Sequence, residues 1–123
     1  MALSVSSQVA PVATQFVLQT SATATADNNV VNAPATVFMI DVDNTANLAE
    51  EVYVKLYNDA APTVGTTAPD MVIMTRRGVR RGVAIPEGTL FDTALSFACV
   101  TTGGTVGTTN PSNAVVVRIL AST

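Results

Sequence analysis

Residues 52–57, VYVKLY, alternate strictly between two kinds of side chain. The first, third and fifth residues are apolar, and a Tyr, a Lys and a Tyr follow them in turn. A period of two places the apolar set on one face of a β-strand and the other set on the opposite face. Asn, Asp, Pro and Gly in residues 58–65 are typical of the loop that ends such a strand.

Six other stretches have the β-branched and apolar content of strands. They are residues 14–20, 35–42, 70–75, 79–85, 90–101 and 114–120. Residues 21–33 are expected to form a long loop or a loop with a short edge strand. The only helical pattern is about one turn at residues 47–51, with Asn47 as its cap. The sequence therefore predicts an all-β fold, an antiparallel, jelly-roll-like β-sandwich of about seven or eight strands.

Several details of this fold are also expected from the sequence. Pro86 and the Glu-Gly after it are expected to close the strand at residues 79–85. Residues 92–93, Asp-Thr, indicate a bulge or a break in the next strand. The last strand contains one polar residue, Arg118, and is expected to lie centrally in its sheet. Cys99 lies in an apolar run and is expected to be a buried, structural thiol.

The chain is expected to hold one domain. A length of 123 residues fits a single domain. Residues 1–13 mix Ser, Val and Ala with a Pro and are interpreted as an N-terminal arm. Residues 14–123 are interpreted as the single β-sandwich domain. We expect no targeting segment and no transmembrane helix, because the N-terminus does not have the pattern of a signal peptide and no apolar run reaches 18 residues.

The inventory of side chains argues against most catalytic and metal sites. The chain has no His and one Cys, which excludes His-based nucleophilic catalysis and the usual closed zinc sites. Asp41 and Asp43 are a pair on one face of a strand, and we interpret them as the solvated end of that strand. The glycine-rich segment at residues 103–107 does not have the pattern of a phosphate-binding loop. We therefore expect no enzyme activity, no cofactor and no metal.

An arginine cluster is the first candidate for a functional site. Arg76, Arg77, Arg80 and Arg81 supply four of the six positive charges of the chain. Arg side chains favour interfaces and bind carboxylates with two hydrogen bonds, so the cluster is interpreted as a docking patch for protein. A solvated strand edge, protected by charge from stray pairing, is the alternative. Nucleic acid is not the expected partner, because the net charge is −3 and no aromatic residue stands among the arginines.

Tyr53, Lys55 and Tyr57 form the second candidate site, on the polar face of their strand. Tyr is common at interfaces, so this face is a second candidate contact surface. Packing of the face under one of the chain's own loops is the alternative. The low charged content of the chain, 12%, also favours contact with other protein over life as a free monomer.

Residues 52–120 resemble a small domain found in virion proteins of tailed bacteriophages. The resemblance rests on a K-L-Y-N step at residues 55–58, an A-P-x-x-G-T turn at 61–66 with Pro69, a P-E-G step at 86–88 with Phe91, and a Gly/Thr loop at 101–110 before a valine-rich last strand. These are turn residues and strand ends. Residues 75–82 are more basic than the pattern.

The resemblance implies a structural component of a virion, with a capsid decoration protein as the preferred role. Its partner would be the major capsid protein or another virion protein, and it would bind itself as a homo-oligomer, a dimer or a trimer. No membrane partner is expected. A tail or fibre component is one alternative. A receptor- or carbohydrate-binding module is another, and it would use Tyr53 or Tyr57 beside Asp59.

Overall fold

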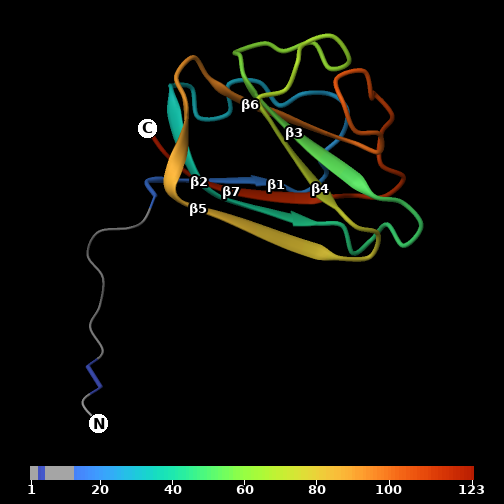
Figure 1. Cartoon of the computed structure of the whole chain (residues 1–123), viewed down its shortest axis with the longest axis horizontal. Helices are drawn as coiled ribbons and strands as arrows, with labels where there is room; N and C mark the ends of the chain where they lie inside the picture. The colour runs from blue at the N-terminus through green and yellow to red at the C-terminus, as the bar shows by residue number, and fades with distance from the viewer. Residues whose placement is uncertain (1–2, 5–12) are drawn as a thin grey trace.

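The computed structural model describes residues 3–4 and 13–123 (Figure 1). The predicted arm, residues 1–13, therefore lies mostly outside the described residues. Within the described part, the chain forms seven β-strands and no helix. Accordingly, no described segment is a helix of the length and apolar character that a membrane span requires.

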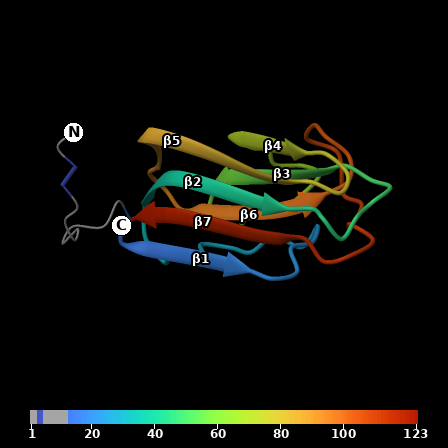
Figure 2. The same ribbon diagram turned by 90° about the horizontal axis from the view of Figure 1, so that it is seen from below.

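The strands form two antiparallel sheets. A four-stranded sheet has the order β1-β7-β2-β5, and a three-stranded sheet has the order β4-β3-β6. Figure 2 shows the two sheets as facing layers, which confirms the predicted β-sandwich. The last strand lies between β1 and β2, in the predicted central position. The strands are β1 (Gln15–Gln19), β2 (Ala35–Asp43), β3 (Val52–Asn58), β4 (Met71–Thr75), β5 (Arg80–Phe91), β6 (Leu95–Val100) and β7 (Val116–Ser122).

One hydrophobic core fills the space between the sheets. The apolar face of β3 is fully buried, and it packs in the same cluster as Val117 and Ile119 of β7 and Ile40 of β2. Removal of such apolar area from water contributes about 25 cal/mol per Å². Cys99 of β6 lies in this core, and burial raises the pKa of its thiol to about 12. At neutral pH it is therefore a neutral, structural thiol, as predicted.

Strand β5 does not end at Pro86. It continues to Phe91 and turns up toward the start of β6 (Figure 1). Of the bulge or break expected at residues 92–93, the structure has the break, which separates β5 from β6. Val37 of β2 pairs with Thr89 and Met39 pairs with Ala84, so residues 85–88 of β5 bulge opposite a single residue of β2. A proline is tolerated there because β5 is an edge strand and the bulge removes the ladder hydrogen bond that proline could not donate.

The predicted helical turn at residues 47–51 is not formed, and this expectation was wrong. Asn47 is buried and ties two loops together instead. Its amide nitrogen donates to Asn44 Oδ1 (2.9 Å) and to the carbonyl of Asn113 (3.1 Å), and its Oδ1 accepts from the backbone N–H of Asn113 (2.8 Å). Asn side chains compete with helical hydrogen bonds in this way, and a single turn is too short to resist the competition.

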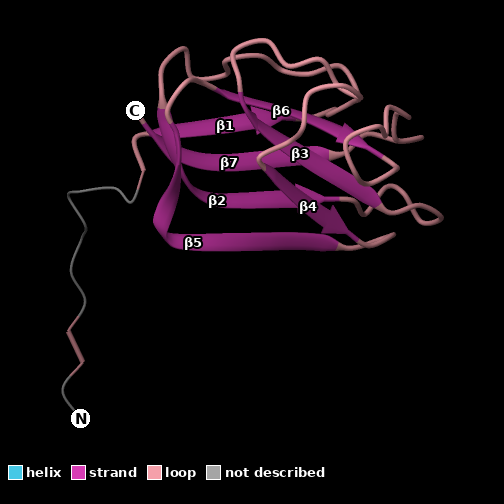
Figure 3. Cartoon of the chain, turned by 45° about the horizontal axis from the view of Figure 1, so that its top comes forward, coloured by secondary structure: helices cyan, strands magenta, loops and turns pink. Residues whose placement is uncertain are grey.

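Residues 21–33 form a loop that covers the outer edge of β6. Asp27 makes an isolated antiparallel bridge with Phe97, and the N–H of Cys99 donates to the carbonyl of Thr23 at 2.8 Å. Figure 3 shows this and the other loops in pink beside the magenta strands. The loop therefore occupies backbone groups that β6 would otherwise present at the edge of its sheet.

Candidate interaction surfaces

The loop at residues 101–110 lies over β3 on the outer face of the three-stranded sheet. Lys55 points from β3 into this cover and is fully buried. Its Nζ donates to the carbonyl oxygens of Gly107 (2.9 Å) and Thr105 (3.3 Å). Burial lowers the pKa of the Lys55 ammonium, and the two carbonyls offset part of the cost of removing this charge from water.

Tyr57 is also fully buried, and burial raises the pKa of its hydroxyl. Tyr53 is half-buried under the same loop, where a Cβ on Gly103 would lie 3.0 Å from Tyr53 Cε1. Of the two interpretations of this strand face, the structure supports the second: the face packs under one of the chain's own loops. Lys55 and Tyr57 present no surface to a partner or to a sugar, and of the three predicted residues only Tyr53 keeps partial exposure.

The sequence signal for this cover is the glycine spacing of residues 103–107. A Cβ on Gly107 would lie 2.1 Å from the backbone oxygen of Thr102, so no other residue fits the turn without a shift of backbone. The absence of a side chain lets the loop fold tightly enough for its carbonyl to reach Lys55. The glycines therefore belong to the covering loop and to its contact with β3.

The arginine cluster divides into two pairs with different surroundings. Arg80 binds Asp41, with Arg80 Nε 2.9 Å and 3.1 Å from its two oxygens and Nη2 2.7 Å from Oδ2. Arg118 Nη1 lies 3.5 Å from the same carboxylate, which is nearly buried. The expectation that Asp41 is a solvated strand end was therefore wrong: two neighbouring strands supply cations that hold it on the sheet.

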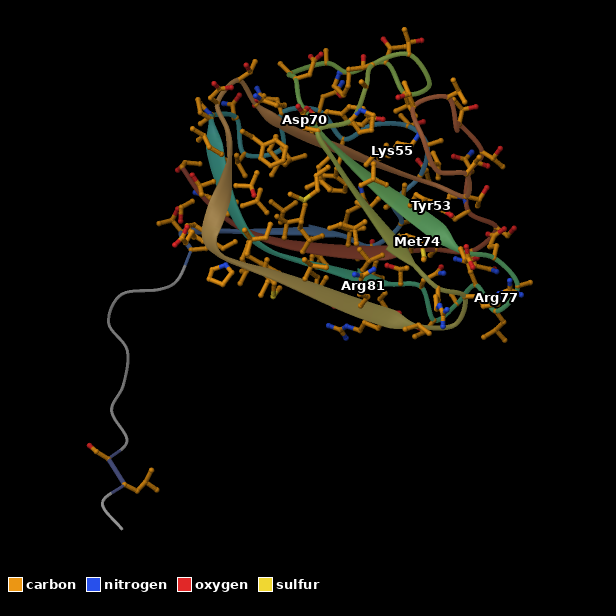
Figure 4. All side chains as sticks on the ribbon, in the orientation of Figure 1. Tyr53, Lys55, Asp70, Met74, Arg77 and Arg81 are labelled. Carbon is orange, nitrogen blue, oxygen red and sulfur yellow. The ribbon has the colours of Figure 1, made fainter. Side chains whose placement is uncertain are left out.

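Arg81 points to the other side of β5. Its Nη1 donates to the carbonyl of Met74 (2.8 Å) and so joins the edges of β5 and β4, as Figure 4 shows. Arg76 and Arg77 lie in the turn between β4 and β5 and are exposed. Arg80 and Arg81 are exposed as well, but Asp41 and the carbonyl of Met74 hold their side chains. Arg76 and Arg77 are therefore the two arginines of the cluster without such a contact among the described residues.

The outer face of the four-stranded sheet is a surface that the sequence analysis did not identify. Figure 2 looks onto this sheet, with β1, β7, β2 and β5 in front. Pairing places Phe16, Leu120, Met39 and Ala84 side by side in one row across all four strands. Directly opposite residues in antiparallel strands share a face, and the neighbouring residues of β7 point into the core, so this row points outward.

This outer face is apolar around its charged centre. The exposed fraction is 57% for Phe16, 51% for Leu18 and 63% for Leu90. Leu18 lies in the same row as Arg118 and Asp41, whereas Leu90 pairs with Thr36 near the other end of β2. Exposed apolar side chains grouped on one face are typical of contact surfaces. The sequence places Phe16 and Leu18 two residues apart, on one face of a strand. Alternation with a period of two does not show whether that face of an edge strand is covered.

The described residues hold no group of three or more Cys, Asp or Glu side chains placed to bind a metal ion. An open groove of about 370 Å³ lies between β4 and β5, with Met71, Met74, Val83 and Ile85 in its walls. No protein-family model matches the chain, and the comparison with curated proteins finds no match.

Proposed function

We propose that the chain is a non-enzymatic structural protein of a virion, a decoration protein that binds the outside of a capsid shell across the joints between shell subunits. The observation that carries the proposal is the difference between the two sheets. On the three-stranded sheet the chain's own loop covers Lys55 of β3, whereas on the four-stranded sheet the described residues leave an apolar row open beside an ion-paired centre. The likeness of residues 52–120 to virion domains supports the same role.

The mechanism is adhesion. The apolar row of Phe16, Leu120, Met39 and Ala84 is buried against the shell, and burial of its exposed area stabilises the contact. A protein that binds the assembled shell and not its separated subunits stabilises the shell by mass action. The gain is about 2.7 kcal/mol for each site when free protein is at about 100 times its Kd.

Imaging tests the location. Particles are purified from the source of the chain, with the full chain carrying a label after the exposed C-terminal Thr123. Regularly spaced label on the outer surface of the capsid supports the proposal. Label confined to the tail supports the tail or fibre alternative, and particles without label overturn both.

Binding to shells stripped of the protein tests the surface. The variant Met39→Gln with Ala84→Glu makes the apolar row polar without touching the core. We expect it to bind shells about tenfold more weakly or worse, a loss of about 1.4 kcal/mol. Val106→Glu is the control, because Val106 is 78% exposed on the loop that covers the other sheet. Equal losses in both variants, or none in the first, contradict the assignment of this face.

A further inference from the structure

Three of the four sheet edges carry at least one feature that opposes pairing with another strand. The edge of β6 is covered by residues 21–33, whose backbone groups bond to Phe97 and Cys99. The edge of β5 carries two arginines, a proline and a bulge. At the edge of β4, Arg81 occupies the carbonyl of Met74. Charge, proline, bulges and covering loops are the devices by which proteins block edge pairing.

The fourth edge, β1, has none of these devices in the part of the chain that the structure describes. Among the described residues β1 pairs with β7 alone, so one side of the strand carries unpaired backbone N–H and C=O groups. The strand QFVLQ has no charged residue, no proline and no glycine. Phe16 and Leu18 are more than half exposed on its outer face. An edge of this kind is a template for an added strand.

The sequence around β1 is almost the same in both directions. Residues 14–20 read TQFVLQT, in which only Phe16 and Leu18 exchange on reversal. In an antiparallel pair centred on Val17, Phe16 faces the partner's Leu18, and Leu18 faces the partner's Phe16. Each Gln15 faces the partner's Gln19, and each Thr14 faces the partner's Thr20. Apolar residues thus face apolar residues, polar residues face polar residues, and no like charges meet.

We propose that two copies of this chain pair through their β1 edges around a two-fold axis at Val17. A two-fold axis requires a surface that complements itself, and the near-palindrome at residues 14–20 meets this requirement. The two four-stranded sheets then become one continuous sheet of eight strands. The two outer faces join into one surface, with the apolar pairs of Phe16 and Leu18 at its middle.

A single pair of short strands is smaller than a standard protein interface, so we expect a weak dimer in free solution. On a shell, two copies held at neighbouring sites would pair at a high effective concentration. The proposal is consistent with the decoration role but does not depend on it, because the pairing is measured with the purified full chain and no particle. If the chains do not pair through β1, the proposal that the outer face binds a shell still stands.

Disulfide trapping tests the register. Facing residues in an antiparallel pair have Cα atoms about 4.5–5.5 Å apart, within the range that a disulfide spans. Two copies of residue 16 would be offset by two residues along the strands and lie about 8 Å apart, beyond that range. We therefore expect a mixture of Phe16→Cys and Leu18→Cys chains to form a mixed disulfide under mild oxidation, and each variant alone to remain largely unlinked.

Two controls complete the test. Thr108→Cys, exposed on the loop over the other sheet, reports random collision and is expected to stay unlinked with either partner. In wild-type protein, sedimentation is expected to show an average mass that rises with concentration, and Leu18→Lys is expected to abolish the rise by placing charge in the pairing strand. The proposal is overturned if the mixture forms no more disulfide than the controls, if Phe16→Cys alone links as well, or if wild type stays monomeric at millimolar concentration.

Discussion

Lys55 lies on the strand face that the sequence pattern marks as polar, yet in the structure it is buried. In the sequence it alternates with apolar residues and looks like a solvent-facing cation. In the fold its stem packs on the outer side of β3, and its ammonium ends on the carbonyls of Thr105 and Gly107. A buried ammonium is tolerated when carbonyl acceptors replace water, and here the acceptors lie about 50 residues away in the chain.

Replacement of Lys55 by Met is expected to destabilise the protein by about 1–3 kcal/mol, because the carbonyls of Thr105 and Gly107 lose their donor. Hydrogen exchange is expected to show loosening at residues 101–110. Tyr57→Phe is the matched variant on the same strand. The buried Tyr57 hydroxyl has no hydrogen-bond partner among the described residues, so its removal is expected to leave stability unchanged or slightly higher. Chemical denaturation measures the free energy of unfolding of both variants. A larger loss of stability for Tyr57→Phe than for Lys55→Met would contradict the role of Lys55 in holding the loop at residues 101–110.

Strand β5 is the element in which local sequence rules and the fold differ most. A Pro-Glu-Gly step usually ends a strand, yet β5 passes through it because an edge strand can bulge without disturbing a second neighbour. Gly88 makes the bulge possible with a φ of +77°. Its hydrogen atom also points at Thr36, since a Cβ there would lie 2.3 Å from Thr36 Cγ2.

Gly88→Ala is therefore expected to destabilise the protein by about 1–3 kcal/mol through a positive φ and a clash with β2. Gly82→Ala on the same strand is the control. Its φ is not positive, and a Cβ there would make an ordinary contact 3.8 Å from Asp41 Oδ1, so the expected change is within about 0.5 kcal/mol. Thermal unfolding of the two variants makes the comparison, and equal stability of both would show that the bulge relaxes freely.

At the scale of the whole molecule, the two sheets have different outward faces. The three-stranded sheet carries its own loop, and the four-stranded sheet carries exposed apolar residues around an ion-paired Asp41. The exposed Arg76 and Arg77 lie at the end of the sandwich where the β4–β5 turn lies (Figure 4). The molecule therefore offers an apolar face and, at one end, a basic corner.

If this basic corner guides the protein to an acidic shell surface, Arg76→Ser with Arg77→Ser is expected to weaken binding to shells several-fold at low salt and to reduce its salt dependence. Folding stability is expected to change by no more than about 0.5 kcal/mol, because both side chains are exposed. Arg76→Lys with Arg77→Lys preserves the charge and is expected to preserve most of the binding. Shell binding that is insensitive to salt and to both variants would identify the pair as a solvated turn.

The strands and the buried positions were predictable from the sequence because they depend on neighbours one or two residues apart. Alternation at residues 52–57 indicated the core face of β3, the apolar run indicated a central β7, and Cys99 was correctly expected to be buried. Only the tertiary structure decided which outer face lies open. That choice depends on the position of the loop at residues 101–110 relative to Lys55, on the pairing of Arg80 with Asp41, and on the position of β1 at an edge. A period of two distinguishes the two faces of a strand, but contacts across the whole chain determine what covers each face.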